Sequence, residues 1–143
     1  MSLAANPWEE VGWRGFALTR LQRTYTPLTA ALIVGILWGL WHIPLFLWAK
    51  SPMSAFPFID WFVGILGMSC ILAWLYNSAN QSLAVAMVFH ISTNVFGALT
   101  GIHSHFALAM VTTTAAIGLV CRYGRTLGFD GSPSRGVALH VTL

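Results

Sequence analysis

Charged side chains are scarce in this sequence of 143 residues. Asp, Glu, Lys and Arg together make up only 8% of it, whereas about a quarter of an ordinary soluble domain is charged. Between Asp60 and Arg122 the sequence has none of these four residue types. Hydrophobic residues make up 57%, and the mean hydropathy is +0.72. This composition excludes a disordered or ordinary soluble chain and indicates a protein of the lipid bilayer.

Basic residues are also few, which limits the kinds of molecule that the chain can bind. Seven Lys and Arg residues stand against four Asp and Glu residues, so the pI of about 9.3 reflects a small excess of charge. Nucleic-acid binding requires a run of phosphate contacts, and so few basic side chains cannot supply it. We therefore expect no nucleic-acid partner and interpret the basic residues as determinants of membrane orientation.

Four mostly apolar runs have the length of membrane-spanning helices. They cover residues 28–48, 59–76, 83–99 and 106–121. A helix of about 20 apolar residues crosses a bilayer, and only helices and closed barrels can do so. We expect no cleaved signal peptide, because the first residues are acidic where a signal peptide is basic. The sequence therefore predicts an all-α, polytopic transmembrane helical bundle of about four spans.

A further helix is expected before the first span, carrying the motif EExxxR. Residues 7–23 are apolar on one side and charged on the other, and Pro7 can start a helix there. We expect residues 1–121 to form the helical core. Residues 122–143, rich in Gly and Ser, are expected to form a flexible cytoplasmic tail.

The basic residues predict the orientation in the membrane. With four crossings, the segments before the first span and after the fourth lie on the same side. These segments hold most of the basic residues, namely Arg20, Arg23, Arg122, Arg125 and Arg135, while Lys50 lies across the membrane. The excess of Lys and Arg in cytoplasmic segments therefore places both charged ends in the cytoplasm.

Polar side chains within the predicted spans are candidates for a functional site. His42 lies in the first span near Pro44, and His90 and Asn94 share one face of the third span. A strongly polar residue inside a span costs about 2.5–3.5 kcal/mol on insertion scales, so function is the default explanation. The alternative is structural, because a histidine can bond a neighbouring carbonyl and an asparagine can join two helices.

The rise of an α-helix predicts that these residues meet the acidic segment. If the N-terminal helix turns at residues 24–27 into the first span, Glu9 and His42 each lie about 20–25 Å beyond the turn. His90 and Asn94 then lie about 10 and 17 Å from the same membrane surface, within one or two turns of that level. We therefore expect one polar pocket.

The two glutamates are expected to have different roles in that pocket. Glu10 and Arg14 are spaced i,i+4 and can pair, which leaves Glu9 without a cation of its own. Glu9 and His42 could then activate a water molecule, with the two polar residues of the third span as donors to a developing oxyanion. These residue types suit hydrolysis of a peptide bond without a covalent intermediate.

Other hydrolytic chemistries have less support. The sequence has no GxSxG motif, and no base lies near Cys70 to activate it as a nucleophile. Two Glu and two His could supply zinc ligands, but there is no HExxH motif and the candidates are spread over three helices. We expect no metal or cofactor, with zinc as the alternative left open.

Three motifs in a fixed order resemble a known family. They are EExxxR at residues 9–14, an aromatic residue four positions before a histidine at 38–42, and HxxxN at 90–94. Over about residues 7–99 the chain resembles the CPBP family of intramembrane proteases, which includes CaaX prenyl proteases, bacteriocin-processing enzymes and Abi-like proteins. The family usually has Phe where this chain has Trp38. The resemblance implies two groups of site residues: catalytic Glu9, His42, His90 and Asn94, and site-shaping Glu10, Arg14 and Trp38.

The resemblance also implies an activity. The chain would be a glutamic endopeptidase that hydrolyses a peptide bond of a membrane-associated or CaaX-type substrate, in some cases a lipidated one, without a cofactor. A metallo-endopeptidase is a less favoured form of the same activity. The alternative is a non-catalytic membrane protein of the same fold, either an immunity or scaffold partner or a proton-linked transport element.

Two further expectations rest on the resemblance. Members of the family carry two to four membrane helices before EExxxR, and here six residues precede Pro7. We therefore expect residues 1–121 to be a partial protease core, to which a partner chain or an oligomer could supply helices. The residues in and around the motifs are similar to those of bacterial members, so the expected location is the bacterial inner membrane.

Overall fold

The computed structural model describes residues 6–100 and 104–129, and the regular secondary structure of this part of the chain is entirely helical. Its order is η1 (Asn6–Trp8), η2 (Val11–Leu18), α1 (Thr19–Leu21), α2 (Pro27–Trp41), α3 (Ile43–Leu47), η3 (Pro52–Ala55), α4 (Phe58–Ser78), α5 (Leu83–Thr100), α6 (His105–Tyr123) and η4 (Gly124–Thr126). The predicted all-α bundle is confirmed.

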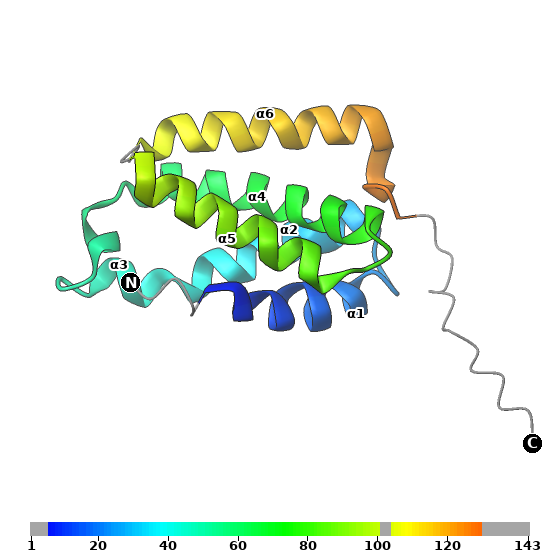
Figure 1. Ribbon diagram of the computed structural model, residues 1–143, viewed down its shortest axis with the longest axis horizontal. Coiled ribbons are helices and arrows are strands. Elements are labelled where there is room, and N and C mark those ends of the chain that lie inside the picture. Colours follow the sequence, from blue (N-terminus) through cyan, green and yellow to red (C-terminus); the bar gives the residue numbers. More distant parts are fainter. Residues whose placement is uncertain (1–5, 101–103, 130–143) are drawn as a thin grey trace, which may run out of the picture.

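Successive long helices run in opposite directions (Figure 1). Helix α4 occupies the centre and has its most extensive contacts with α6 and α2, while α5 packs against it from another side. The N-terminal segment, which runs from η1 to α1, lies along α2 and α5. It therefore forms a hairpin with α2, as predicted from the turn at residues 24–27.

Three helical segments are long and apolar enough to cross a membrane: Pro27–Leu47, Phe58–Ser78 and His105–Thr126. The third predicted span is a shorter apolar helix, Leu83–Gly97. Its polar side chains are His90, Ser92, Thr93 and Asn94. The chain thus has three candidate spans, one shorter apolar helix and an N-terminal helical segment.

The first span contains a break at the predicted histidine. Thr26 caps the start of α2 through its side chain, which accepts a hydrogen bond from Thr29 N. Helix α2 ends at Trp41, and α3 begins at Ile43 with Pro44 in its first turn. Proline has no N–H to continue the hydrogen bonding of α2, so His42 lies at the junction of the two helices.

The N-terminal segment differs from the regular helix that its pattern predicts. Residues Val11–Leu18 form a π-helix, with Arg14 and Leu18 fully buried along it. The Thr19 hydroxyl donates a hydrogen bond to Arg14 O (2.9 Å) and also contacts the Tyr76 hydroxyl (3.1 Å). π-Helical segments are rare and frequently occur at functional sites.

Small residues allow α4 and α6 to approach closely. A Cβ atom on Gly67 would lie 2.6 Å from the backbone carbon of Thr112. The Thr112 hydroxyl donates a hydrogen bond to Gly64 O (3.1 Å) across the same contact. Such contacts between small residues stabilise helix pairs in membranes, where burial of apolar surface provides no driving force.

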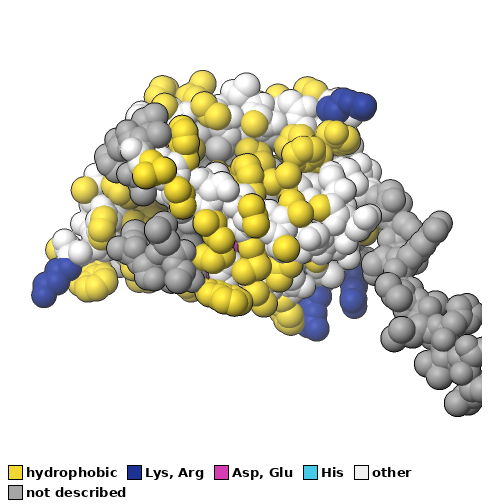
Figure 2. Space-filling view, in the orientation of Figure 1, with side chains coloured by type: hydrophobic (Ala, Val, Ile, Leu, Met, Phe, Trp, Pro, Cys, Tyr) yellow, Lys and Arg dark blue, Asp and Glu magenta, His cyan; other side chains and the backbone are white. Residues whose placement is uncertain are grey.

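Basic side chains lie at the ends of the bundle, with hydrophobic side chains between them (Figure 2). The end of α6 lies beside the turn between α1 and α2, because buried Leu127 packs in one cluster with Leu18 and Ala30. The segments that carry Arg20 and Arg125 therefore share one end of the bundle. Of the predicted tail, residues 122–129 are described, and 130–143 lie outside the described residues.

Candidate active site

The side chain of Trp38 lies at the centre of the predicted site. It is 3% exposed, and its indole Nε1–H donates a hydrogen bond to Glu9 Oε2 at 2.8 Å. The Arg14 guanidinium carbon lies 4.8 Å from the indole ring centroid, which is a cation–π geometry. The His90 ring lies edge-on to the same indole at 5.5 Å. Residues from the N-terminal segment, α2 and α5 therefore meet at one side chain.

Glu10 forms the charged core of the site. Its carboxylate is fully buried, and Oε1 accepts a hydrogen bond from Arg14 Nη1 (3.0 Å) and contacts His90 Nδ1 (2.7 Å). The predicted i,i+4 pair of Glu10 and Arg14 is confirmed. The contact with His90 was not expected, because helix rise predicted that His90 and the acidic segment lie at similar depths but did not predict which side chains touch.

Arg14 is held by a second set of contacts on its other side. Nη2 donates to Ser69 Oγ (3.4 Å), and Ser69 in turn donates to Ala31 O (2.8 Å). Complete burial lowers the pKa of Arg14, and the adjacent Glu10 carboxylate raises it. Gly35 leaves the space for this arrangement, since a Cβ there would lie 3.0 Å from Ser69 Cβ.

The conformation of His42 follows from the break between α2 and α3. Its Nδ1 lies 2.9 Å from Trp38 O, and a carbonyl can only accept, so Nδ1 carries the hydrogen. The rings of Trp41 and Trp61 lie 4.9 and 5.0 Å from the imidazole. In the neutral ring Nε2 therefore has the free lone pair and can accept a proton.

The predicted residues do not all touch one another. Within residues 6–100 and 104–129, no direct hydrogen bond joins Glu9 to His42, and Trp38 links them by its indole and its carbonyl. Asn94 is half-buried one helical turn beyond His90, and its side chain makes no hydrogen bond with the described residues. The hairpin prediction is confirmed to within one turn, because Glu9 lies level with Trp38.

Sequence reasoning missed Ser69, Trp41 and Trp61 as contacts of the site. Ser69 is a small polar residue within the apolar run of α4, and that is a usable signal. Trp61 resembles an interfacial anchor in the sequence, and Trp41 resembles a packing residue within the first span, so neither has a comparable signal. Among the described residues, no group of three or more His, Cys, Asp or Glu side chains could hold a metal ion.

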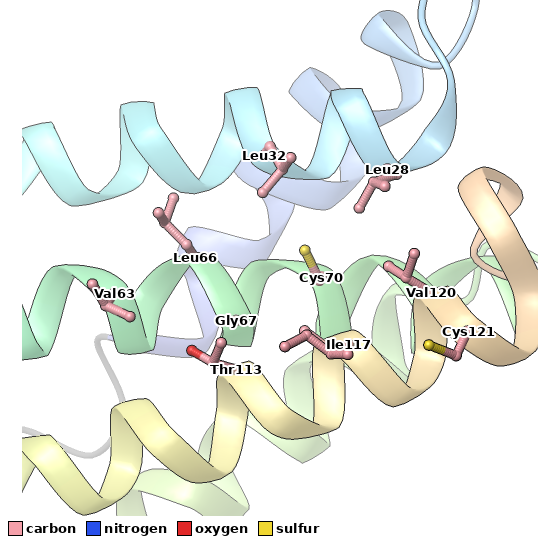
Figure 3. Close-up of a pocket in the computed structure, with 11 residues that line it drawn as sticks. Leu28, Leu32, Val63, Leu66, Gly67, Cys70, Thr113, Ile117, Val120 and Cys121 are labelled. Carbon is pink, nitrogen blue, oxygen red and sulfur yellow. The ribbon is translucent and has the colours of Figure 1, made fainter.

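An apolar cavity of about 320 Å³ lies apart from these residues (Figure 3). It is lined by residues of α2, α4 and α6, and Cys70 and Cys121 are among them. None of the seven predicted site residues lines it. The polar cluster and the largely apolar cavity are therefore separate features of the bundle.

Comparison with known proteins assigns the family. Residues 1–96 match the family described as type II CAAX prenyl endopeptidase, Rce1-like. The chain is 34% identical over 99 residues to a protein named CAAX prenyl protease 2 from Methanococcus maripaludis, covering 65% of this chain. The match covers 36% of that relative, so the chain spans about a third of its length. No solved structure matches significantly. The chain therefore belongs to the Rce1-like family of type II CAAX prenyl endopeptidases, membrane-embedded proteases that act on protein substrates and are not known to use a cofactor.

Proposed function

We propose that this chain hydrolyses a peptide bond in a membrane-associated or CaaX-type protein substrate. Glu9 and His42 would activate the attacking water, and His90 and Asn94 would donate hydrogen bonds to the oxyanion. The observation that carries the proposal is the meeting of EExxxR, the α2 motif and His90 around Trp38. Three separate helical segments supply these groups, so a purely local structural explanation does not account for them.

The different environments of the two glutamates support different roles. Glu10 is fully buried and its Oε1 is shared by Arg14 and His90. Glu9 is half-buried, and one oxygen accepts from Trp38 while the other accepts no hydrogen bond from the described residues. Glu10 Oε2 also has no hydrogen-bond partner among the described residues, but it is buried, so the half-buried Glu9 is the glutamate that water can reach and is the better general base.

The tautomers support the assignment of the histidines. His42 presents the lone pair of Nε2, which suits a group that takes a proton from water. His90 donates from Nδ1 to the Glu10 carboxylate, so it can donate from Nε2 only when the ring carries both hydrogens.

The reaction follows from these positions. Water loses a proton to Glu9 or His42, and its oxygen bonds to the carbonyl carbon of the scissile peptide. The negative charge that develops on the carbonyl oxygen is stabilised by His90 and Asn94. As the carbon–nitrogen bond breaks, the carbonyl re-forms and the base returns its proton to the leaving amine. The acid product then gives its hydroxyl proton to the amine or to solvent, which leaves a carboxylate, an ammonium and the residues in their starting states.

The proposal includes a location and an assembly. Both charged ends would lie in the cytoplasm, with the site within the bilayer and open to that side, and the inner membrane of a bacterium is the proposed host. The proposed chemistry uses side chains and needs no cofactor. A partner chain or a second copy could supply the helices that complete the wall around the carboxylates.

Peptide cleavage by the detergent-purified chain tests the proposal. The substrates are quenched-fluorescent peptides of prenylated CaaX, unprenylated CaaX and leader type. We expect wild type to cleave at least one of them, and Glu9→Gln to lower the rate about a hundredfold or more, because a general base is lost. Asp60→Asn is the matched control, since it also converts a carboxylate to an amide. Absence of cleavage by the folded wild type, or full activity of Glu9→Gln, would contradict the proposal.

A further inference from the structure

The position of the Glu9 carboxylate depends on few contacts. Glutamate has three rotatable side-chain bonds, and Glu9 is only half-buried. In the described part of the chain its carboxylate has one hydrogen bond, from Trp38 Nε1 at 2.8 Å. A general base must point at the proton that it removes, and small displacements of catalytic groups lower rates strongly.

Trp38, by contrast, has little freedom to move. It is 3% exposed and packs with Leu72 and Ala86 in a buried cluster. Its ring is also fixed by the Arg14 guanidinium on one face and by the edge of His90. The indole N–H is therefore a rigid donor directed at a mobile acceptor.

We propose that the indole N–H of Trp38 is the positioning group that sets the direction of the Glu9 carboxylate. The proposal rests on the proposed function, in which Glu9 is the base. One oxygen of Glu9 is held by the indole, which leaves the other oxygen to face the water molecule. Trp38 is a positioning residue and not a catalytic one, because it acts on the reaction only through Glu9.

The same residue also connects Glu9 to His42. The Trp38 carbonyl accepts the hydrogen of His42 Nδ1 at 2.9 Å, so one residue orients both groups that would take the proton of water. The two contacts use different parts of Trp38. A change of the side chain that keeps the backbone removes the contact with Glu9 and leaves the contact with His42.

The substitution Trp38→Phe removes the N–H donor and keeps an aromatic ring. Phenylalanine keeps an aromatic face for Arg14 and an edge for His90, but it has no N–H. We expect kcat to fall about tenfold with KM unchanged within about twofold, because a positioning group acts on the chemical step. Trp74→Phe is the control. Within the described residues, the Trp74 indole nitrogen is buried without a hydrogen-bond partner.

A spectroscopic measurement tests the contact without activity. In the full chain labelled with ¹⁵N-tryptophan in detergent, the indole signal that disappears in Trp38→Phe belongs to Trp38. We expect this signal to move upfield in Glu9→Ala, because the acceptor is lost, while the Trp74 signal stays in place.

The outcomes distinguish the two proposals. An unmoved Trp38 signal in Glu9→Ala, or a Trp38→Phe kcat within about twofold of wild type, would overturn the role of Trp38. If wild type cleaves no peptide, the proposed function fails, and the indole signal still decides whether Trp38 holds Glu9. If Trp38→Phe does not fold, the same signal is assigned by elimination of the other six tryptophans, and Glu9→Ala decides the case.

Discussion

The carboxylate of Glu10 lies 2.7 Å from Nδ1 of His90, although 80 residues separate them in the chain. The same oxygen is also 3.0 Å from Arg14 Nη1, so Glu10 joins the N-terminal segment to α5. Both Glu10 and Arg14 are fully buried. This ionic contact ties the first and third motifs together and leaves Glu9 as the glutamate without a cationic partner.

Loss of the Arg14 side chain is expected to destabilise the chain strongly. Arg14→Ala removes the guanidinium from the buried Glu10 carboxylate and leaves His90 as its one donor among the described residues, which costs about 3–5 kcal/mol in free energy of unfolding. Arg23→Ala is the matched control, because Arg23 is exposed and its loss should change stability by less than about 0.5 kcal/mol. Unfolding in mixed micelles with increasing denaturant measures both.

The double variant Glu10→Gln with Arg14→Gln provides the counter-check. It removes both charges, so it should recover part of the stability that Arg14→Ala loses. If the double variant is no more stable than Arg14→Ala, the loss comes from packing and not from an unpaired charge.

The contact between α4 and α6 depends on Gly67. Gly67→Ala would place a methyl group against the backbone of Thr112, at 2.6 Å from its carbon. We expect a loss of about 1–3 kcal/mol, as for other overpacked contacts. Gly118→Ala is the control on α6, where a Cβ meets nothing within 4 Å, and it should be neutral or stabilising by up to about 1 kcal/mol. Equal melting temperatures for the two variants would show that the helices do not approach this closely.

The orientation is testable with single cysteines. In a chain with Cys70→Ala and Cys121→Ala, the substitutions Lys50→Cys and Arg125→Cys put one thiol at each end of the bundle. A membrane-impermeant maleimide should label position 50 only in right-side-out vesicles and position 125 only in inside-out ones. Labelling of both positions from the same side would exclude the proposed orientation.

Periodicity and spacing predicted much of this architecture. Apolar runs located the long helices, and the i,i+4 rule predicted the pair of Glu10 and Arg14. Each of these depends on neighbours in sequence. The hairpin of the N-terminal segment and α2 also followed, because helix rise fixes depth once the turn is known.

Contacts between distant helices could not be predicted in the same way. Helix rise gives depth but not rotation, so it could not pair Glu10 with His90 or direct the Trp38 indole at Glu9. The π-helical run at Val11–Leu18 has no local sequence signal, because regular α-helix would satisfy its propensities equally well.

The central claim is that Glu9, and not a bound metal, activates water. The most direct measurement compares the cleavage rate of wild type and Glu9→Gln, each after dialysis against a zinc chelator, on the peptide that wild type cleaves best. The account predicts that chelator-treated wild type keeps its full rate and that Glu9→Gln loses about a hundredfold or more. Loss of the wild-type rate after chelation, with recovery on adding zinc, would contradict it and identify a metal enzyme.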